Sequence, residues 1–281
     1  MEAAAAEEAA YRTAGAAERR RFVRETLAPA PGETVVSVGP GPGFEPLELA
    51  DAVGPAGRVV GVDRSVPMTR LARDRLSGVP EASVVAGDAT ALPLPDGAAD
   101  AVTAVQVLQY LGSPGDALAE IRRVLRPSGR AAVFLVDWDT LVVRGADRSS
   151  TERVLTAWRD HCRHPTLGSR LHEAASASGL AVRSVDPYAV AAHDPVDDSF
   201  AGHLLDFVAE FVADHGAVGT AAATRWRERV ATATEEGRAF VGVTGYCHLL
   251  TPEDTPDRPR GLRTPGATPP GRPPTRRRPR R

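Results

Sequence analysis

The stretch TVVSVGPGPG, residues 34–43, decides the fold of this chain. A short run of strand character, Thr34–Val38, leads into glycines at every second position, Gly39, Gly41 and Gly43. Glycine lacks a Cβ atom, so the backbone can turn sharply there and approach a small molecule closely. A helix that follows such a turn offers free N–H groups at its start, which favour a charged ligand. The stretch therefore predicts a strand, a ligand-binding turn and a helix.

The spacing of the glycines distinguishes two kinds of nucleotide site. A dinucleotide-binding fingerprint has the form G-x-G-x-x-G and would need a glycine at position 44, where this chain has Phe44. The spacing here is G-x-G-x-G, which is weak evidence when taken alone. An NAD(P)-dependent oxidoreductase is therefore an alternative that Phe44 disfavours.

The composition is that of a globular protein with a full core, since 42% of the 281 residues are hydrophobic and 25% are charged. No apolar run approaches the roughly 18 residues of a membrane span. The start, MEAAAAEE, is acidic where a signal peptide is basic. The two cysteines, Cys162 and Cys247, form no metal-binding or disulfide pattern. Together these features predict a soluble protein of a reducing cytoplasm.

Charge is unevenly distributed along the chain. Residues 252–281 contain nine arginines and three acidic residues, a net charge of +6, so the formal total of −2 leaves about −8 on the rest. An acidic body is unlike the basic surface that a nucleic-acid enzyme needs, so no nucleic-acid partner is expected. Nine of the 24 prolines also fall in the last thirty residues. A segment of this composition has little to bury, which predicts a disordered tail over residues 251–281.

Strand-like and helical segments alternate from residue 34 onward, as in a doubly wound parallel sheet. The first five strands are expected at residues 34–38, 58–62, 83–86, 101–105 and 131–136, with a turn at 126–129 before the fifth. Later helices are expected at residues 151–162, 169–178, 199–215 and 220–236, and later strands at 181–185 and 239–250. Residues 1–30 predict one or two helices. The chain thus divides into segments 1–30, 31–250 and 251–281.

Two acidic residues end neighbouring strands of the predicted sheet. Asp63 ends the second strand, 20 residues beyond Gly43, and Asp88 ends the third in the sequence Gly87-Asp88-Ala89. Ligands of open α/β sheets bind at the carboxyl ends of the strands. A carboxylate at Asp63 could accept both hydroxyls of a ribose. The alternative is that Asp63 caps the next helix, but Ser65 can serve as that cap.

Several segments together resemble one enzyme family. They are PGETVVSVG (31–39), GRVVGVD (57–63), GDA (87–89), QVLQYL (106–111) and EIRRVLRPSGR (120–130). Residues 31–137 resemble a class I S-adenosylmethionine (SAM)-dependent methyltransferase of the ubiquinone/menaquinone-biosynthesis (UbiE-like) type. The resemblance implies an α/β, Rossmann-like, doubly wound sheet of seven mostly parallel strands with an antiparallel last strand. It also implies helical insertions that cover the substrate and an N-terminal helical lid over residues 1–30, for which a frayed terminal helix is the plain alternative.

The resemblance implies SAM as the cofactor and assigns residues to it. Asp63 would hold the ribose, and Asp88 would accept from the adenine amino group. The glycine turn and the end of the fourth strand would hold the methionine half. The residues expected to bind the cofactor are Ser37, Gly39, Pro40, Gly41, Gly43, Asp63, Arg64, Met68, Gly87, Asp88, Ala89, Val105 and Gln106.

Ser37 departs from the family pattern. The family has an acid at this position, which helps to hold the methionine half or its glycine turn. Serine can still form a hydrogen bond, but it lacks the charge that would offset a sulfonium or an ammonium. We therefore expect weaker SAM affinity or, as the second option, a fold retained without methyl transfer.

No residue stands out as catalytic. Asp137, after the fifth strand, is a candidate to orient or deprotonate a substrate hydroxyl. Gln109, after the fourth strand, is a further candidate, and His203 is a candidate base in the covering segment. Each has a plain structural alternative as a cap, core or surface residue. His161 and His164 lack further ligands nearby, so no metal site is expected.

The predicted activity is methyl transfer from SAM to an oxygen, nitrogen or carbon of a small, apolar metabolite. In-line displacement at a sulfonium methyl needs little acid–base help, so positioning and desolvation would supply most of the acceleration. The alternatives are a SAM-fold protein without methyl transfer (cofactor-binding or cyclase-like), the oxidoreductase, and an RNA methyltransferase that uses the arginine-rich tail. The sequence is compatible with a monomer or a homodimer.

Overall fold

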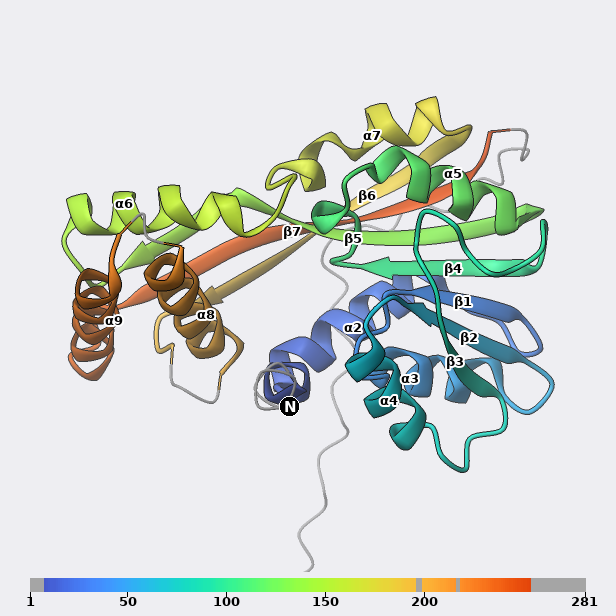
Figure 1. Ribbon diagram of the computed structural model, residues 1–281, viewed down its shortest axis with the longest axis horizontal. Coiled ribbons are helices and arrows are strands. Elements are labelled where there is room, and N and C mark those ends of the chain that lie inside the picture. Colours follow the sequence, from blue (N-terminus) through green and yellow to red (C-terminus); the bar gives the residue numbers. More distant parts are fainter. Residues whose placement is uncertain (1–7, 196–198, 216–217, 254–281) are drawn as a thin grey trace, which may run out of the picture.

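Seven strands form one sheet in the order β3-β2-β1-β4-β5-β7-β6 in the computed structural model, which describes residues 8–195, 199–215 and 218–253 (Figure 1). The strands β1 to β5 pair in parallel, and β7 pairs antiparallel with both β5 and β6. This arrangement confirms the predicted Rossmann-like sheet with a reversed last strand. The strands are β1 (Thr34–Val38), β2 (Arg58–Asp63), β3 (Ala82–Ala86), β4 (Ala99–Val105), β5 (Leu125–Arg144), β6 (Leu180–Ala192) and β7 (Phe240–Pro252).

Helices lie on both faces of the sheet: α5 and α7 cover one face, and α2, α3 and α4 lie against the other (Figure 1). The remaining helices gather around the far ends of β5, β6 and β7 (Figure 1). The helices are α2 (Ala14–Leu27), α3 (Phe44–Val53), α4 (Val66–Arg75), α5 (Pro114–Val124), α6 (Arg148–Trp158), α7 (Leu167–Ala177), α8 (Phe200–Asp214) and α9 (Thr220–Glu235), with short 3-10 turns at Leu108–Tyr110 and Arg159–His161. No helix in the described part of the chain is both long and apolar enough to cross a membrane.

Local signals set the helix starts near the glycine turn. Gly43 precedes α3 with φ 88°, and a Cβ atom there would lie 2.8 Å from the Cα atom of Ala72. The third glycine of the turn therefore lets α3 and α4 approach closely. Ser65 caps α4 by accepting a hydrogen bond from the backbone N–H of Met68, as the sequence suggested.

The strands of the second half are longer than predicted. The fifth strand was expected at residues 131–136 after a turn at 126–129, but β5 begins at Leu125 and runs to Arg144, so the predicted turn is wrong. β6 likewise continues to Ala192. Both extensions pair with β7, with Arg144 opposite Phe240 and Ala192 opposite Val241. The hydrogen bonds of this partner stabilise strand segments whose own sequence did not indicate them.

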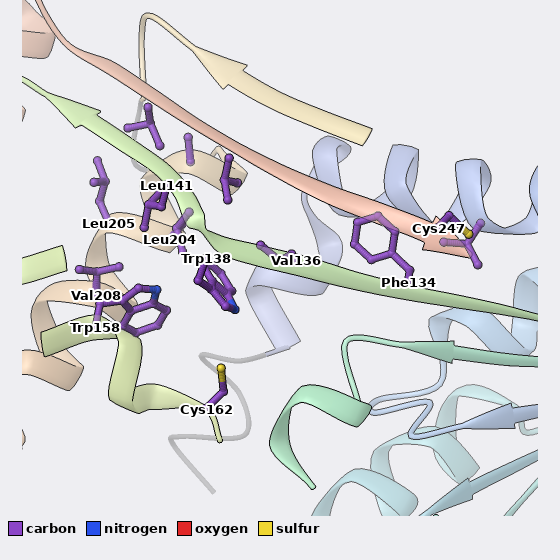
Figure 2. Close-up of a cluster of buried hydrophobic side chains, with 14 of the residues drawn as sticks. Phe134, Val136, Trp138, Leu141, Trp158, Cys162, Leu204, Leu205, Val208 and Cys247 are labelled. Carbon is purple, nitrogen blue, oxygen red and sulfur yellow. The ribbon is translucent and has the colours of Figure 1, made fainter. Parts of the chain in front are cut away.

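The pleat of β5 divides two hydrophobic cores. Phe134, Val136 and Trp138 belong to the core that includes residues of α2, α3, α6, α8 and α9, whereas Val133 and Leu135 belong to the core under α5 and α7. Figure 2 shows the first set along β5, with Trp138 near Trp158 of α6. One strand thus contributes to the packing of both layers.

The chain termini test the predicted boundaries only in part. Residues 8–12 and α2 are helical, and α2 packs on β4, β5 and β7. Residues 254–281 of the predicted tail lie outside the described residues, and the predicted tail start at 251 falls within β7. The division into lid, catalytic domain and tail stays a prediction.

Candidate functional site

A cleft of about 390 Å³, here called the glycine-turn cleft, lies at the carboxyl ends of β1, β2, β3 and β4. Its position is the one expected for a ligand of an open α/β sheet. Its walls are Tyr11, Gly39, Gly41, Val62, Asp63, Arg64, Ser65, Met68, Gly87, Ala89, Gln106, Val107, Tyr110 and Leu111.

Two of the predicted glycines keep this cleft open. A Cβ atom on Gly39 would lie 2.4 Å from a methyl carbon of Val107, and one on Gly41 would lie 3.2 Å from the hydroxyl of Tyr11. Both residues also have positive φ angles, 64° and 55°. A side chain at Gly39 or Gly41 would therefore both strain the turn and fill the space that a ligand needs.

Asp63 joins the glycine turn to the start of α4. One carboxylate oxygen accepts from the backbone N–H of Gly41 at 3.0 Å, and the other accepts from the N–H of Ser65 at 2.8 Å. Each oxygen keeps a further lone pair. The carboxylate is thus fixed at the cleft wall with capacity to accept two ligand hydroxyls, as its predicted ribose role requires.

Asp88 lies beside the cleft, between two residues that line it, Gly87 and Ala89. Its Oδ1 accepts from the backbone N–H and the hydroxyl of Thr90, and these hydrogen bonds lower the pKa of the Asp88 carboxyl. The second oxygen has no hydrogen bond to any residue in the described ranges. The predicted adenine contact is compatible with this placement and stays a prediction.

Gln106 occupies the junction between two cavities. It follows β4 with φ 55°, a left-handed conformation that is uncommon for a residue with a side chain, and its N–H donates to the carbonyl of Phe134 at 2.8 Å. Strained backbone of this kind persists at sites where the surrounding structure fixes it. Gln106, Tyr11 and Tyr110 line both the glycine-turn cleft and the cavity described next.

The second cavity, here called the aromatic cavity, has a volume of about 530 Å³. The aromatic side chains that line it include Trp158 of α6, Trp138 in the far part of β5, and Phe200, Phe207 and Phe211 of α8, so an apolar ligand has aromatic surface to pack against. Its walls are Ala10, Tyr11, Arg19, Gln106, Tyr110, Trp138, Trp158, His161, Phe200, His203, Leu204, Phe207, Glu210, Phe211, Asp214 and His215.

Arg19 is an unpaired cation in the wall of the aromatic cavity. Its side chain is 7% exposed, it lies over the ring of Phe200 at 5.1 Å, and it forms no hydrogen bond or ion pair with any described residue. Burial lowers the pKa of its guanidinium. Glu210 and Asp214 line the same cavity without pairing with it. A buried guanidinium without a partner is costly, which points to a ligand group that accepts hydrogen bonds there.

His161 forms part of the same wall through ring stacking. Its ring lies parallel to that of Trp158, with centroids 3.8 Å apart, and its Nδ1 lies 2.6 Å from the carbonyl oxygen of Trp158. Burial lowers the pKa of His161 to about 4, so the ring is neutral at neutral pH. His161 is therefore a rigid aromatic surface. In the part of the chain that the structure describes, no three His, Cys, Asp or Glu side chains gather as a metal site.

The three catalytic candidates lie in different surroundings. His203 lines the aromatic cavity, whereas Asp137 and Gln109 line neither cavity. Asp137 is 5% exposed and accepts from the N–H of Asp139, and Gln109 is fully buried with its Oε1 near the N–H of Val136. Of the three, His203 alone lines one of the two cavities, and its role stays a prediction.

The predicted cofactor residues also divide into those that line a cavity and those that do not. Eight line the glycine-turn cleft: Gly39, Gly41, Asp63, Arg64, Met68, Gly87, Ala89 and Gln106. The others lie behind or beside its wall: Ser37, Pro40, Gly43, Asp88 and Val105. Their roles toward the cofactor stay predictions.

Sequence reasoning missed the residues that the N-terminal segment contributes. Tyr11 lies against Gly41, and the guanidinium groups of Arg12 and Arg20 lie 5.8 Å and 5.0 Å from the centre of the Phe44 ring. Arg75 of α4 contacts the same ring at 3.6 Å. Cation–π contacts of this kind attach the N-terminal segment to the start of α3. An aromatic residue at position 44, where a dinucleotide turn has glycine, could have indicated such a contact from the sequence. Its arginine partners lie far away in the sequence and could not be identified.

Comparison with known proteins finds a methyltransferase domain in the first half of the chain. Residues 36–133 match the family described as methyltransferase domain. The chain is 34% identical over 243 residues to an uncharacterized 37.1 kDa protein in transposon TN4556 of Streptomyces fradiae, which covers 83% of this chain and 67% of that protein. It is 38% identical over 114 residues to a demethylmenaquinone methyltransferase of Renibacterium salmoninarum, over 41% of this chain and 46% of that enzyme. The chain therefore spans less than half the length of this named methyltransferase.

Among solved structures, the [4+2]-cyclase SpnF has a similar fold. It is 24% identical to this chain, with a TM-score of 0.51, over 82% of this chain and 80% of that protein. This likeness concerns the fold alone.

Proposed function

The chain belongs to the class I SAM-dependent methyltransferases, and on that premise we propose that it transfers a methyl group to a small, mainly apolar molecule held in the aromatic cavity. SAM is the cofactor of this family, and the residues of the glycine-turn cleft fit it. The turn leaves space that a Cβ atom would fill, and Asp63 presents a carboxylate with free acceptor capacity.

The observation that carries the proposal is the junction of the two cavities. Tyr11, Gln106 and Tyr110 line both the glycine-turn cleft and the aromatic cavity, so ligands in the two spaces would meet at these residues. When bound, SAM supplies an activated methyl group on its sulfonium. The chain would hold the acceptor in line and exclude water with its aromatic wall, and these two effects supply most of the acceleration of such a transfer.

The substrate would carry at least one group that accepts hydrogen bonds. Arg19 is buried in the cavity wall without a partner, and an acidic oxygen of the substrate would satisfy it. Where the methyl acceptor must lose a proton, His203 is the wall residue suited to take it. If Arg19 instead held the carboxylate of SAM, the variant R19M would raise the Kd for SAM and leave the KM for the acceptor unchanged.

Both cysteines, Cys162 and Cys247, are free and buried. Burial raises the pKa of Cys162 to about 11 and that of Cys247 to about 12, so both thiols are unreactive. We propose a cytoplasmic location from the sequence, in which two cysteines form no disulfide pattern.

The test is a screen for S-adenosylhomocysteine formation with small aromatic and aliphatic acceptors, each with and without an acidic group. Leu204 lies in the cavity wall with 6% exposure, so L204W would fill the space, while L204M keeps its volume. We expect L204W to abolish turnover and to leave SAM binding intact, and L204M to retain both. Turnover by L204W at the normal rate would show that the acceptor binds elsewhere. SAM binding without any turnover across the screen would favour the cyclase-like alternative.

A further inference from the structure

A carboxylate lies beneath the glycine turn although the strand residue there is serine. Ser37 is fully buried in β1, and its hydroxyl donates to Oε2 of Glu45 at 2.6 Å. The hydroxyl of Thr103, on the neighbouring strand β4, donates to the same oxygen at 3.1 Å. Two buried hydroxyls from adjacent strands therefore fix one carboxylate oxygen in place.

Glu45 reaches this position from the first turn of α3, directly after the glycine turn. Its side chain is 8% exposed, and it lies at the end of the helix where the backbone dipole favours a negative charge. Its second oxygen, Oε1, forms no hydrogen bond with any residue in the described part of the chain. The free oxygen leaves the carboxylate with capacity to interact with one more group.

The ligand-free chain stabilises this charge incompletely. Burial raises the pKa of Glu45, and the nearby cation, Arg20, is already paired with Glu48 at 2.8 Å. A buried carboxylate held by neutral hydroxyls is costly unless an opposite charge approaches it. The methionine half of SAM carries two positive groups, an ammonium and the sulfonium, besides its carboxylate, and the resemblance places this half over the glycine turn.

We propose that Glu45, fixed by Ser37 and Thr103, supplies the negative charge that related methyltransferases place at position 37. The acid is relocated by eight residues, from β1 to the start of α3, and is hydrogen-bonded to the residue at position 37; like Ser37, Glu45 does not itself line the glycine-turn cleft. Glu45 is thus a positioning residue for the methionine half of the cofactor. The inference rests on SAM as the cofactor and needs no knowledge of the methyl acceptor.

Three variants test the proposal by calorimetric titration of the full chain with SAM. E45Q is expected to raise the Kd for SAM about tenfold to a hundredfold, the loss typical of a charge-assisted interaction. S37D alone places a second carboxylate against Glu45 and is expected to leave the Kd unchanged or raise it. S37D/E45Q restores a single carboxylate and is expected to bind SAM within about threefold of the unmodified chain, because the two sites would be interchangeable.

The matched control is D51N, which removes a charge from an exposed position of the same helix. It should leave the Kd unchanged, which excludes a general effect of net charge. Titration with S-adenosylhomocysteine, which keeps the ammonium and lacks the sulfonium, shows which positive group Glu45 serves. A larger loss for SAM indicates the sulfonium, and equal losses indicate the ammonium.

Thermal unfolding of the ligand-free chain separates this role from a structural one. A carboxyl whose pKa is raised by folding costs stability as the pH rises above its ordinary range, so E45Q should unfold at the same or a higher temperature at pH 7. Unchanged SAM affinity in folded E45Q, or tighter binding by S37D alone, would overturn the proposal. If E45Q does not fold, S37D/E45Q decides: a folded double variant that does not bind SAM also overturns it. None of these outcomes depends on turnover, so failure here leaves the proposed methyl transfer to its own test.

Discussion

The two cavities of this protein are built in opposite ways. The glycine-turn cleft lies at the ends of strands of five to seven residues, and much of its wall is backbone or small side chains. The aromatic cavity depends on the 20-residue strand β5 and on helices contributed by distant segments, and large side chains form its wall. A wall of backbone is set by local sequence, whereas a wall of side chains is set by long-range packing. The glycine-turn cleft is therefore constrained by motif, whereas the wall of the aromatic cavity is free to vary.

Trp226 offers the strongest test of whether the helices α6, α8 and α9 can be destabilised without affecting the glycine-turn cleft. Its side chain is 1% exposed in α9, and its Nε1 donates to the hydroxyl of Thr151 in α6 at 3.2 Å. W226A should lower the free energy of unfolding by about 3–5 kcal/mol, as is usual for a buried tryptophan. Denaturant unfolding measures this loss, and titration with SAM should give a Kd within about twofold of the unmodified chain in the folded protein. The control E228A changes an exposed residue of the same helix. Loss of SAM affinity in W226A would show that the two regions depend on each other.

Asp63 tests the opposite region. D63A removes the acceptor for the N–H groups of Gly41 and Ser65 and the expected ribose contact. We expect the Kd for SAM to rise about tenfold to a hundredfold, equivalent to about 1.4–2.8 kcal/mol. Calorimetric titration measures this change, and D74N, at an exposed position of α4, is the matched control. An unchanged Kd in D63A would contradict the assignment of the cleft to the cofactor.

A smaller effect is expected on the free energy of unfolding in acid, and it should come from His161 in the wall of the aromatic cavity. Burial lowers the pKa of His161 to about 4, so this side chain is protonated near pH 6.5 in the unfolded chain but only near pH 4 in the folded chain. Stability should therefore fall as the pH drops from about 6.5 to about 4, by about 1–2 kcal/mol after allowance for partial exposure. H161F should flatten this loss in denaturant unfolding, because phenylalanine can stack on Trp158 and does not titrate. H172Q, at an exposed position of α7, should not. An equal loss in H161F would assign the acid sensitivity to other groups, such as His248, whose pKa burial also lowers.

The predictable part of the fold is the part encoded locally. β1 and β2 were placed nearly to the residue because each ends in a visible signal, a glycine turn or a strand-end acid. The extension of β5 beyond Val136 was missed because Asp137 and Asp139 suggested an exposed loop. In the structure this segment pairs with β7, about 100 residues later in the chain, with a local irregularity between Asp137 and Val142. No pattern within the segment reveals such a partner.

The candidate site shows the same division. Gly39, Gly41 and Asp63 line the cleft as the motif indicated, whereas Arg19 and Tyr11 enter from a helical segment whose docking no motif describes. Glu45 was overlooked although a signal existed. It shares a helical face with Leu49 and Val53, both buried, at spacings of four and eight residues. An acid on an otherwise buried face is a candidate for a special role.

The continuity of β5 has a consequence for how such a protein can change over generations. Because strand side chains alternate, one residue inserted into β5 before Phe134 would exchange the members of the two cores along the rest of the strand. The connections that join α6 to α7 and α8 to α9 contain no strand, so they impose no such alternation and tolerate changes in length. New acceptor specificities should therefore arise by lengthening, shortening or replacing these helices and loops. The paired strands β5 and β7 should be inherited without gaps, apart from the irregularity between Asp137 and Val142, where an extra residue can be absorbed.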